Sequence, residues 1–99
     1  MEVSTDELAE ALDAYVLDVR RHEEWVEKRI PGVTLIPMDQ VQARIGEIPQ
    51  DQRVWVVCAV GGRSGRVAEY LRGRGYDAVN VAGGVNKWVE EGRPFETGE

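Results

Sequence analysis

The sequence predicts an α/β domain in which helices cover both faces of a mostly parallel sheet. A chain of 99 residues can bury one hydrophobic core, so residues 1–99 are expected to form a single domain. Short apolar segments alternate with segments of helical pattern, which is typical of parallel strands joined by crossover helices. The apolar segments contain few polar residues, and this favours burial of the sheet on both faces.

The individual elements follow from local patterns and their stop signals. Ser4 and Glu7 have the spacing of a capping box, so a short amphipathic helix carrying Leu8, Ala11 and Leu12 is expected after Ser4. Four strands are expected at residues 15–18, 33–36, 54–58 and 78–81. Further helices, each followed by glycine or proline, are expected at residues 23–28, 38–45, 64–72 and 85–91. The last few residues are expected to fray.

The composition argues against several classes of protein. With 42% hydrophobic residues, 30% charged residues and a net charge of −6, the chain resembles a soluble globule without the basic face of a nucleic-acid-binding protein. No apolar run approaches the roughly 18 residues of a membrane span, and the first residues lack a signal-peptide pattern. A single cysteine excludes an internal disulfide, and with one histidine it makes a zinc site implausible. We therefore expect a cytoplasmic protein with no metal, no organic cofactor, and no nucleic-acid or membrane partner.

The only cysteine stands at the end of an apolar strand and begins a loop suited to chemistry. The loop consists of Cys58, Ala59, Val60, Gly61, Gly62, Arg63 and Ser64, and the next helix is expected to start at Ser64. Amides of residues 59–63 can curve around an anion, the helix N-terminus adds partial positive charge, and Arg63 adds a full charge. These features would lower the pKa of Cys58 into the range of about 3.5–7.5 and favour the nucleophilic thiolate. A small buried apolar cysteine is the alternative, and the Gly-Gly-Arg-Ser continuation favours the reactive one.

Several short motifs in a definite order carry a family resemblance. They are Leu17-Asp18-Val19-Arg20, Glu23-Glu24-Trp25, Ile30-Pro31-Gly32-Val33 with Ile36-Pro37, the loop Cys58 to Ser64, and Val81-Ala82-Gly83-Gly84-Val85 with Trp88. Together, over nearly the full chain, they resemble the single-domain rhodaneses, a sulfurtransferase family. The resemblance implies a rhodanese-like fold with a five-stranded, mostly parallel sheet.

The resemblance also implies roles for individual residues. Cys58 would take up a sulfane sulfur as a persulfide and pass it to another nucleophile. The loop that would bind the substrate and the outer sulfur comprises Ala59, Val60, Gly61, Gly62, Arg63 and Ser64. Asp18 and Arg20 match the family's early Asp-Val-Arg element, which braces the site, and an ordinary ion pair between them is the alternative.

The implied activity is that of a sulfurtransferase of the thiosulfate:cyanide type. The donor would be a compound such as thiosulfate or a persulfide, and the acceptor cyanide, a small thiol or a thioredoxin-like protein. An outside acceptor is required because the sequence contains no second cysteine to resolve the persulfide. Arg63 follows Cys58 by five positions, one fewer than in cysteine phosphatases, and the smaller ring of amides suits one sulfur atom better than phosphate.

One departure from the family leaves the donor and the degree of turnover open. Many sulfurtransferase loops have a basic or polar residue directly after the cysteine, whereas this chain has Ala59 and Val60. The missing charge at the rim disfavours the thiosulfate dianion as the donor. The alternative function is a rhodanese-fold binding or sulfur-sensing module with low turnover.

Overall fold

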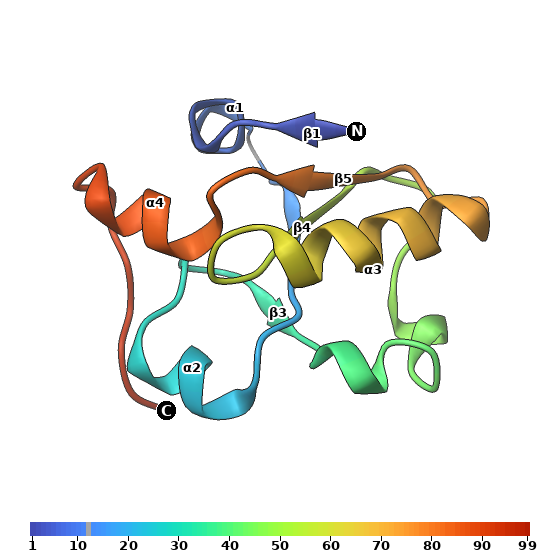
Figure 1. Cartoon of the computed structure of the whole chain (residues 1–99), viewed down its shortest axis with the longest axis horizontal. Coiled ribbons are helices and arrows are strands. Elements are labelled where there is room, and N and C mark those ends of the chain that lie inside the picture. The colour runs from blue at the N-terminus through green and yellow to red at the C-terminus, as the bar shows by residue number, and fades with distance from the viewer. Residues whose placement is uncertain (12) are drawn as a thin grey trace.

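Figure 1 shows the computed structural model of the chain, which describes residues 1–11 and 13–99. Five strands form one sheet in the order β1-β5-β4-β2-β3. Their bounds are β1 (Glu2–Val3), β2 (Tyr15–Asp18), β3 (Thr34–Leu35), β4 (Val54–Val57) and β5 (Ala78–Val81). Every neighbouring pair is parallel. The predicted α/β class with a five-stranded parallel sheet is therefore confirmed.

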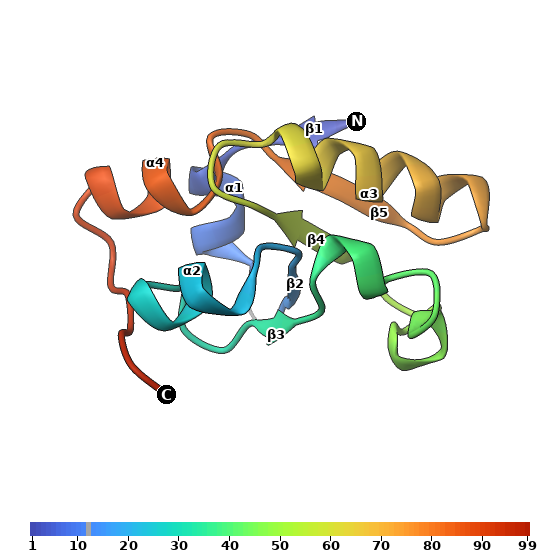
Figure 2. The same ribbon diagram turned by 60° about the horizontal axis from the view of Figure 1, so that its bottom comes forward.

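Helices pack on both faces of this sheet, as predicted. They are α1 (Thr5–Glu10), α2 (His22–Glu27), α3 (Gly62–Gly73) and α4 (Gly84–Glu90), with 3-10 helices η1 (Met38–Gln40) and η2 (Ile45–Glu47). Alternate residues of β4 contribute to two apolar clusters, because successive strand side chains point to opposite faces. One cluster includes α3 and the segment around the 3-10 helices, and the other includes α1 and α4 (Figures 1 and 2).

The predicted helix over residues 38–45 is wrong in kind. Two 3-10 helices separated by turns, Met38–Gln40 and Ile45–Glu47, replace it, and Val41 and the following Ile48 are buried in the core. No side chain caps the N-terminus of η1, and eight residues are too few to hold an α-helix without strong packing.

By contrast, the predicted capping box is present, since Ser4 accepts from the Glu7 amide at 3.1 Å and Glu7 accepts from the Ser4 amide at 3.0 Å. Leu12, which was expected in the first helix, lies outside the described residues.

The two ends of the chain form pairings that local patterns did not predict. Strand β1 has only two residues, and it pairs with β5 in the register Glu2 to Asn80. Near the C-terminus, Arg29 and Glu96 exchange two backbone hydrogen bonds of 2.9 Å in an antiparallel bridge. Figure 2 shows this C-terminal segment running from α4 past α2. This bridge ties the segment around Glu96, which was expected to fray, to the chain just after α2.

Gly84 allows the start of α4 to contact the backbone that follows β4. The amides of Val85 and Asn86 donate to the carbonyl oxygens of Cys58 and Ala59 at 2.9 and 3.1 Å. A Cβ atom on Gly84 would lie 2.2 Å from the Cys58 oxygen, and the residue has a φ of +58°. Only glycine satisfies both the left-handed backbone and the close approach.

Gly84→Ala is expected to destabilise the protein by about 2–5 kcal/mol. The left-handed backbone contributes about 1–2 kcal/mol, and overpacking against the Cys58 carbonyl contributes about 1–3 kcal/mol. Urea unfolding measures the loss. Gly92→Ala is the matched control, because Gly92 has a φ of +79° but a Cβ atom there would meet no other atom within 4 Å, so only the backbone cost applies. Equal destabilisation by the two substitutions would show that the close approach costs nothing.

Candidate active site at the carboxyl edge of the sheet

The candidate site lies where β2 and β4 end side by side. Asp18 pairs in register with Val57, the last residue of β4, and Cys58 follows immediately. The chain then turns through Gly61, whose φ of +116° favours glycine, and enters α3 at Gly62. Carboxyl ends of parallel strands are the usual location of binding sites in open α/β sheets.

The sulfur of Cys58 is buried but faces hydrogen-bond donors. The residue is 1% exposed, the Gly61 amide lies 3.0 Å from Sγ, and the Ser64 hydroxyl oxygen lies 3.2 Å from it. Burial raises the pKa of the Cys58 thiol, but the Ser64 hydroxyl and the amides of Ser64, Gly61 and Val60 together lower its pKa below the ordinary value. The site therefore favours a thiolate more than a cysteine packed only among aliphatic side chains would.

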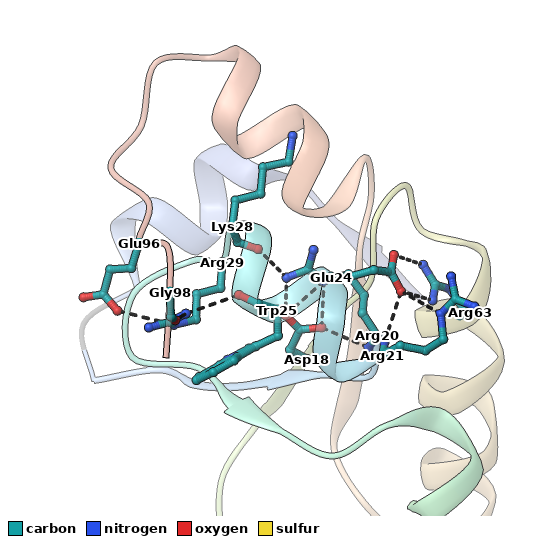
Figure 3. A network of polar contacts seen from close by, with 10 residues as sticks. All are labelled: Asp18, Arg20, Arg21, Glu24, Trp25, Lys28, Arg29, Arg63, Glu96 and Gly98. Atoms are coloured by element: carbon teal, nitrogen blue, oxygen red, sulfur yellow. Dashed lines mark hydrogen bonds and ion pairs between the residues drawn. The ribbon is translucent and has the colours of Figure 1, made fainter.

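Arg63, which the sequence predicts as a source of positive charge at the cysteine loop, forms an ion pair with a carboxylate on α2. Its two terminal nitrogens lie 2.7 and 2.9 Å from the Glu24 carboxylate oxygens, a bidentate pair that Figure 3 shows in full. The Arg63 hydrogen bonds hold the pKa of Glu24 at about 2. Arg63 thus joins the start of α3 to α2, and its charge is partly neutralised beside the cysteine loop.

The pair predicts a specific dependence of stability on pH. Because the pKa of Glu24 is about 2 in the folded protein and 4.5 ordinarily, its contribution is complete above about pH 4.5 and is lost as pH falls toward 2. Glu24→Gln should lower stability by about 1 kcal/mol at neutral pH, and the deficit relative to wild type should shrink below pH 4.5. Thermal melts between pH 7 and pH 2.5 measure it. The exposed Glu27 on the same helix provides the control Glu27→Gln, and a deficit that stays constant with pH would contradict the assignment.

Asp18 and Arg20 form a buried ion pair beside the loop. Arg20 Nη2 lies 2.8 Å from Asp18 Oδ2, and Nε lies 3.0 Å from Oδ1. Both residues are nearly inaccessible, with exposures of 0% for Asp18 and 2% for Arg20. The same Nη2 donates to the Lys28 carbonyl at 2.7 Å, so the pair ties the end of β2 to the residue that caps α2 (Figure 3). These contacts suit a bracing role better than a surface ion pair.

A cavity of about 290 Å³ opens beside Arg63. Its lining residues come from the ends of β2 and β3 and from the starts of α2, η1 and α3: Val19, Arg21, Pro37, Met38, Asp39 and Arg63. On the loop itself, Val60 is 65% exposed. The cavity therefore borders the loop at Arg63, and Val60 lies at the surface. Within residues 1–11 and 13–99, no group of three or more His, Cys, Asp or Glu side chains is arranged to hold a metal ion.

Sequence reasoning missed two residues that the structure brings to the site. Glu24 was matched only as part of the Glu23-Glu24-Trp25 motif, and the acidic residues of its helix were expected to form a solvated face or to steer a basic protein partner, not to bind Arg63. Asn80 lies on β5, is 3% exposed, and hydrogen-bonds to Ser64 and to the Gly61 carbonyl. Its signal was present in the sequence, since an amide inside an apolar strand needs buried partners.

Comparison with known proteins identifies the family. The rhodanese-like domain model matches residues 4–91. A putative sulfurtransferase of Bacillus subtilis, YtwF, is 35% identical over 97 residues, covering 94% of each chain. A protein of Allochromatium vinosum named sulfurtransferase is 35% identical over 89 residues, covering 89% of this chain and 83% of that one. The crystal structure of a rhodanese-like domain protein from Staphylococcus aureus superposes with a TM-score of 0.88 at 38% identity, covering 99% and 98%.

This chain therefore belongs to the rhodanese-like domain family. The resemblance proposed from the motifs is confirmed, and so is the rhodanese-like fold. No helix in the part of the chain that the structure describes is long and apolar enough to cross a bilayer.

Proposed function

We propose that this protein is a rhodanese-type sulfurtransferase that carries a sulfane sulfur as a persulfide on Cys58. The observation that carries the proposal is the sulfur environment: Sγ lies 3.0 Å from the Gly61 amide and 3.2 Å from the Ser64 hydroxyl, in a loop that begins α3. The names of the relatives, among them a thiosulfate sulfurtransferase of Escherichia coli that is 35% identical over 71 residues, support the same class.

The transfer proceeds in two displacements that need no outside oxidant. The Cys58 thiolate attacks the sulfane sulfur of the donor, an S–S bond forms, and the donor's S–S bond breaks with its electron pair leaving on the remaining fragment. The outer sulfur then carries the negative charge, which the amides of residues 59–63 and the α3 N-terminus stabilise. An acceptor nucleophile attacks this outer sulfur, and Cys58 leaves as the thiolate.

The charge around the loop favours a persulfide over thiosulfate as the donor. Ala59 and Val60 bring no side-chain charge to the rim, and the Arg63 guanidinium already forms an ion pair with Glu24. Glu24 also lies 3.6 Å from Arg21, the other arginine that lines the cavity. A dianion gains little from arginines that are already paired, whereas a persulfide of a small thiol demands less positive charge.

The acceptor in this proposal is a thiol outside the chain. One cysteine in 99 residues cannot release the sulfur through an internal disulfide, so a small thiol or a thioredoxin-like protein must take it. Thiol acceptors of this kind work in a reducing compartment, which fits a cytoplasmic location.

Intact mass spectrometry tests the proposal directly. The protein is incubated in separate reactions with thiosulfate and with a small-molecule persulfide, and the mass is followed for one added sulfur that cyanide removes. We expect near-complete loading by the persulfide and slower loading by thiosulfate.

The alternative, a low-turnover binding or sensing module, is supported by the same shortage of free positive charge at the rim. A protein that no donor modifies would favour this alternative.

A further inference from the structure

The Ser64 hydroxyl lies between two groups that can each accept a hydrogen bond from it. Ser64 Oγ is 2.5 Å from Asn80 Oδ1 and 3.2 Å from Cys58 Sγ. All three residues are buried, with exposures of 0% for Ser64, 1% for Cys58 and 3% for Asn80. A hydroxyl group has one hydrogen to donate. Ser64 therefore donates its hydrogen bond either to the amide oxygen or to an anionic sulfur, but not to both at once.

The orientation of the Asn80 amide is determined by its other contacts. Its Nδ2 atom lies 3.1 Å from the Gly61 carbonyl oxygen and 3.0 Å from the Glu2 carboxylate on β1. Both partners are acceptors only, so the NH₂ group must face them. A flipped amide would place Oδ1 against two oxygens, and the oxygen is therefore held against Ser64.

We propose that Asn80 is a positioning residue that competes with the Cys58 sulfur for the single hydroxyl hydrogen of Ser64. In the neutral thiol state the competition is absent, because the S–H group can donate to Ser64 Oγ while Ser64 donates to Asn80. In the thiolate state the Ser64 hydrogen must turn to Sγ, and the buried Asn80 oxygen loses its donor. An unpaired buried oxygen is unfavourable, so Asn80 opposes the free thiolate.

The persulfide state removes this conflict, an argument that rests on the proposed sulfurtransferase function. In a Cys58 persulfide the negative charge sits on the outer sulfur, which faces the loop amides, and Sγ no longer needs the Ser64 hydrogen. Ser64 then remains bonded to Asn80. The pair therefore stabilises the loaded protein relative to the free thiolate, which suits a carrier that must hold its sulfur until an acceptor arrives.

Other charges near the loop stay in place when Asn80 is changed. Arg63, from α3, interacts electrostatically with both Cys58 and Asp18, the latter at the end of β2. Glu24, from α2, occupies the Arg63 guanidinium. Asp18 is in turn paired with Arg20. Glu2, from β1, is the charged group that contacts Asn80 itself, and it requires a separate control.

The test is the pH midpoint of Cys58 alkylation by iodoacetamide in a double-mutant cycle. Ser64→Ala should raise the midpoint, because the hydroxyl donor is lost. Asn80→Ala should lower it by about 0.5–1 pH unit, because Ser64 is then free to serve the thiolate. In the Ser64→Ala background, Asn80→Ala should leave the midpoint within about 0.2 unit. Glu2→Gln, which leaves the Ser64 contact intact, should not reproduce the shift.

Two outcomes would overturn the proposal. One is an Asn80→Ala midpoint that is unchanged or raised. The other is an equal shift with and without Ser64, which would mean that Asn80 acts through the Gly61 backbone. If Asn80→Ala does not fold, Asn80→Leu decides: it keeps the side-chain volume but removes the acceptor against Ser64, so the midpoint must fall with Ser64 present and stay within about 0.2 unit in the Ser64→Ala background. The titration needs no sulfur donor, so it stands even where the mass test refutes sulfur transfer.

Discussion

Cys58→Ser is expected to abolish the sulfur adduct completely while leaving the fold intact. Serine has nearly the same shape as cysteine, and its oxygen can accept from the Gly61 amide that lies 3.0 Å from Sγ. The hydroxyl does not ionise near neutral pH, and oxygen does not form the persulfide bond that stores the sulfur. We expect the mass signal of the loaded species to fall from near-stoichiometric to undetectable.

Two controls separate loss of chemistry from loss of structure. Circular dichroism and thermal melting should show a folded Cys58→Ser protein with stability close to wild type. Wild-type protein alkylated at Cys58, the one cysteine of the sequence, should also fail to load. A sulfur adduct that persists on the serine variant would place the acceptor atom elsewhere and refute the proposed mechanism.

Arg20→Ala is expected to cost about 3–5 kcal/mol of stability, the largest structural effect that we predict. The substitution leaves the Asp18 carboxylate at 0% exposure without its guanidinium partner, and the Lys28 carbonyl loses its donor. The total stability of a typical domain is only about 5–15 kcal/mol. The thermal midpoint should therefore fall by at least about 12 °C, measured by calorimetry at neutral pH.

A rescue variant and a surface control make the test specific. Adding Asp18→Asn to Arg20→Ala removes the unpaired buried charge and should recover part of the loss. Arg44→Ala breaks an exposed pair with Glu47 and should cost far less, because solvent screens an exposed ion pair. If Arg20→Ala costs no more than Arg44→Ala, the buried pair contributes nothing to the brace between β2 and α2.

The sequence predicted those features of the fold that depend on residues close together in the chain. The capping box at Ser4 was predictable because its two partners are three positions apart. Alternation of apolar and amphipathic segments predicted the parallel sheet, since short crossover connections permit few other arrangements. The helix expected over residues 38–45 was wrong because its pattern rested on two apolar residues four apart, Val41 and Ile45. Turns and 3-10 helices also bring Val41 into the core and pack Ile45 against it.

By itself, the sequence determined the class of fold and the family, and it predicted which loop carries the reactive cysteine, because order, spacing and glycine positions can be read directly from the chain. Only the tertiary structure decided what surrounds the sulfur. Glu24 and Arg63 are separated by 39 positions and Asn80 and Glu2 by 78, yet each pair is in direct contact. The physical reason is that the stabilisation of a Cys58 anion depends on which ion-pair and hydrogen-bond partners Arg63 and Ser64 already have. Those partners come from α2 and β5, which only the packed sheet brings to the loop.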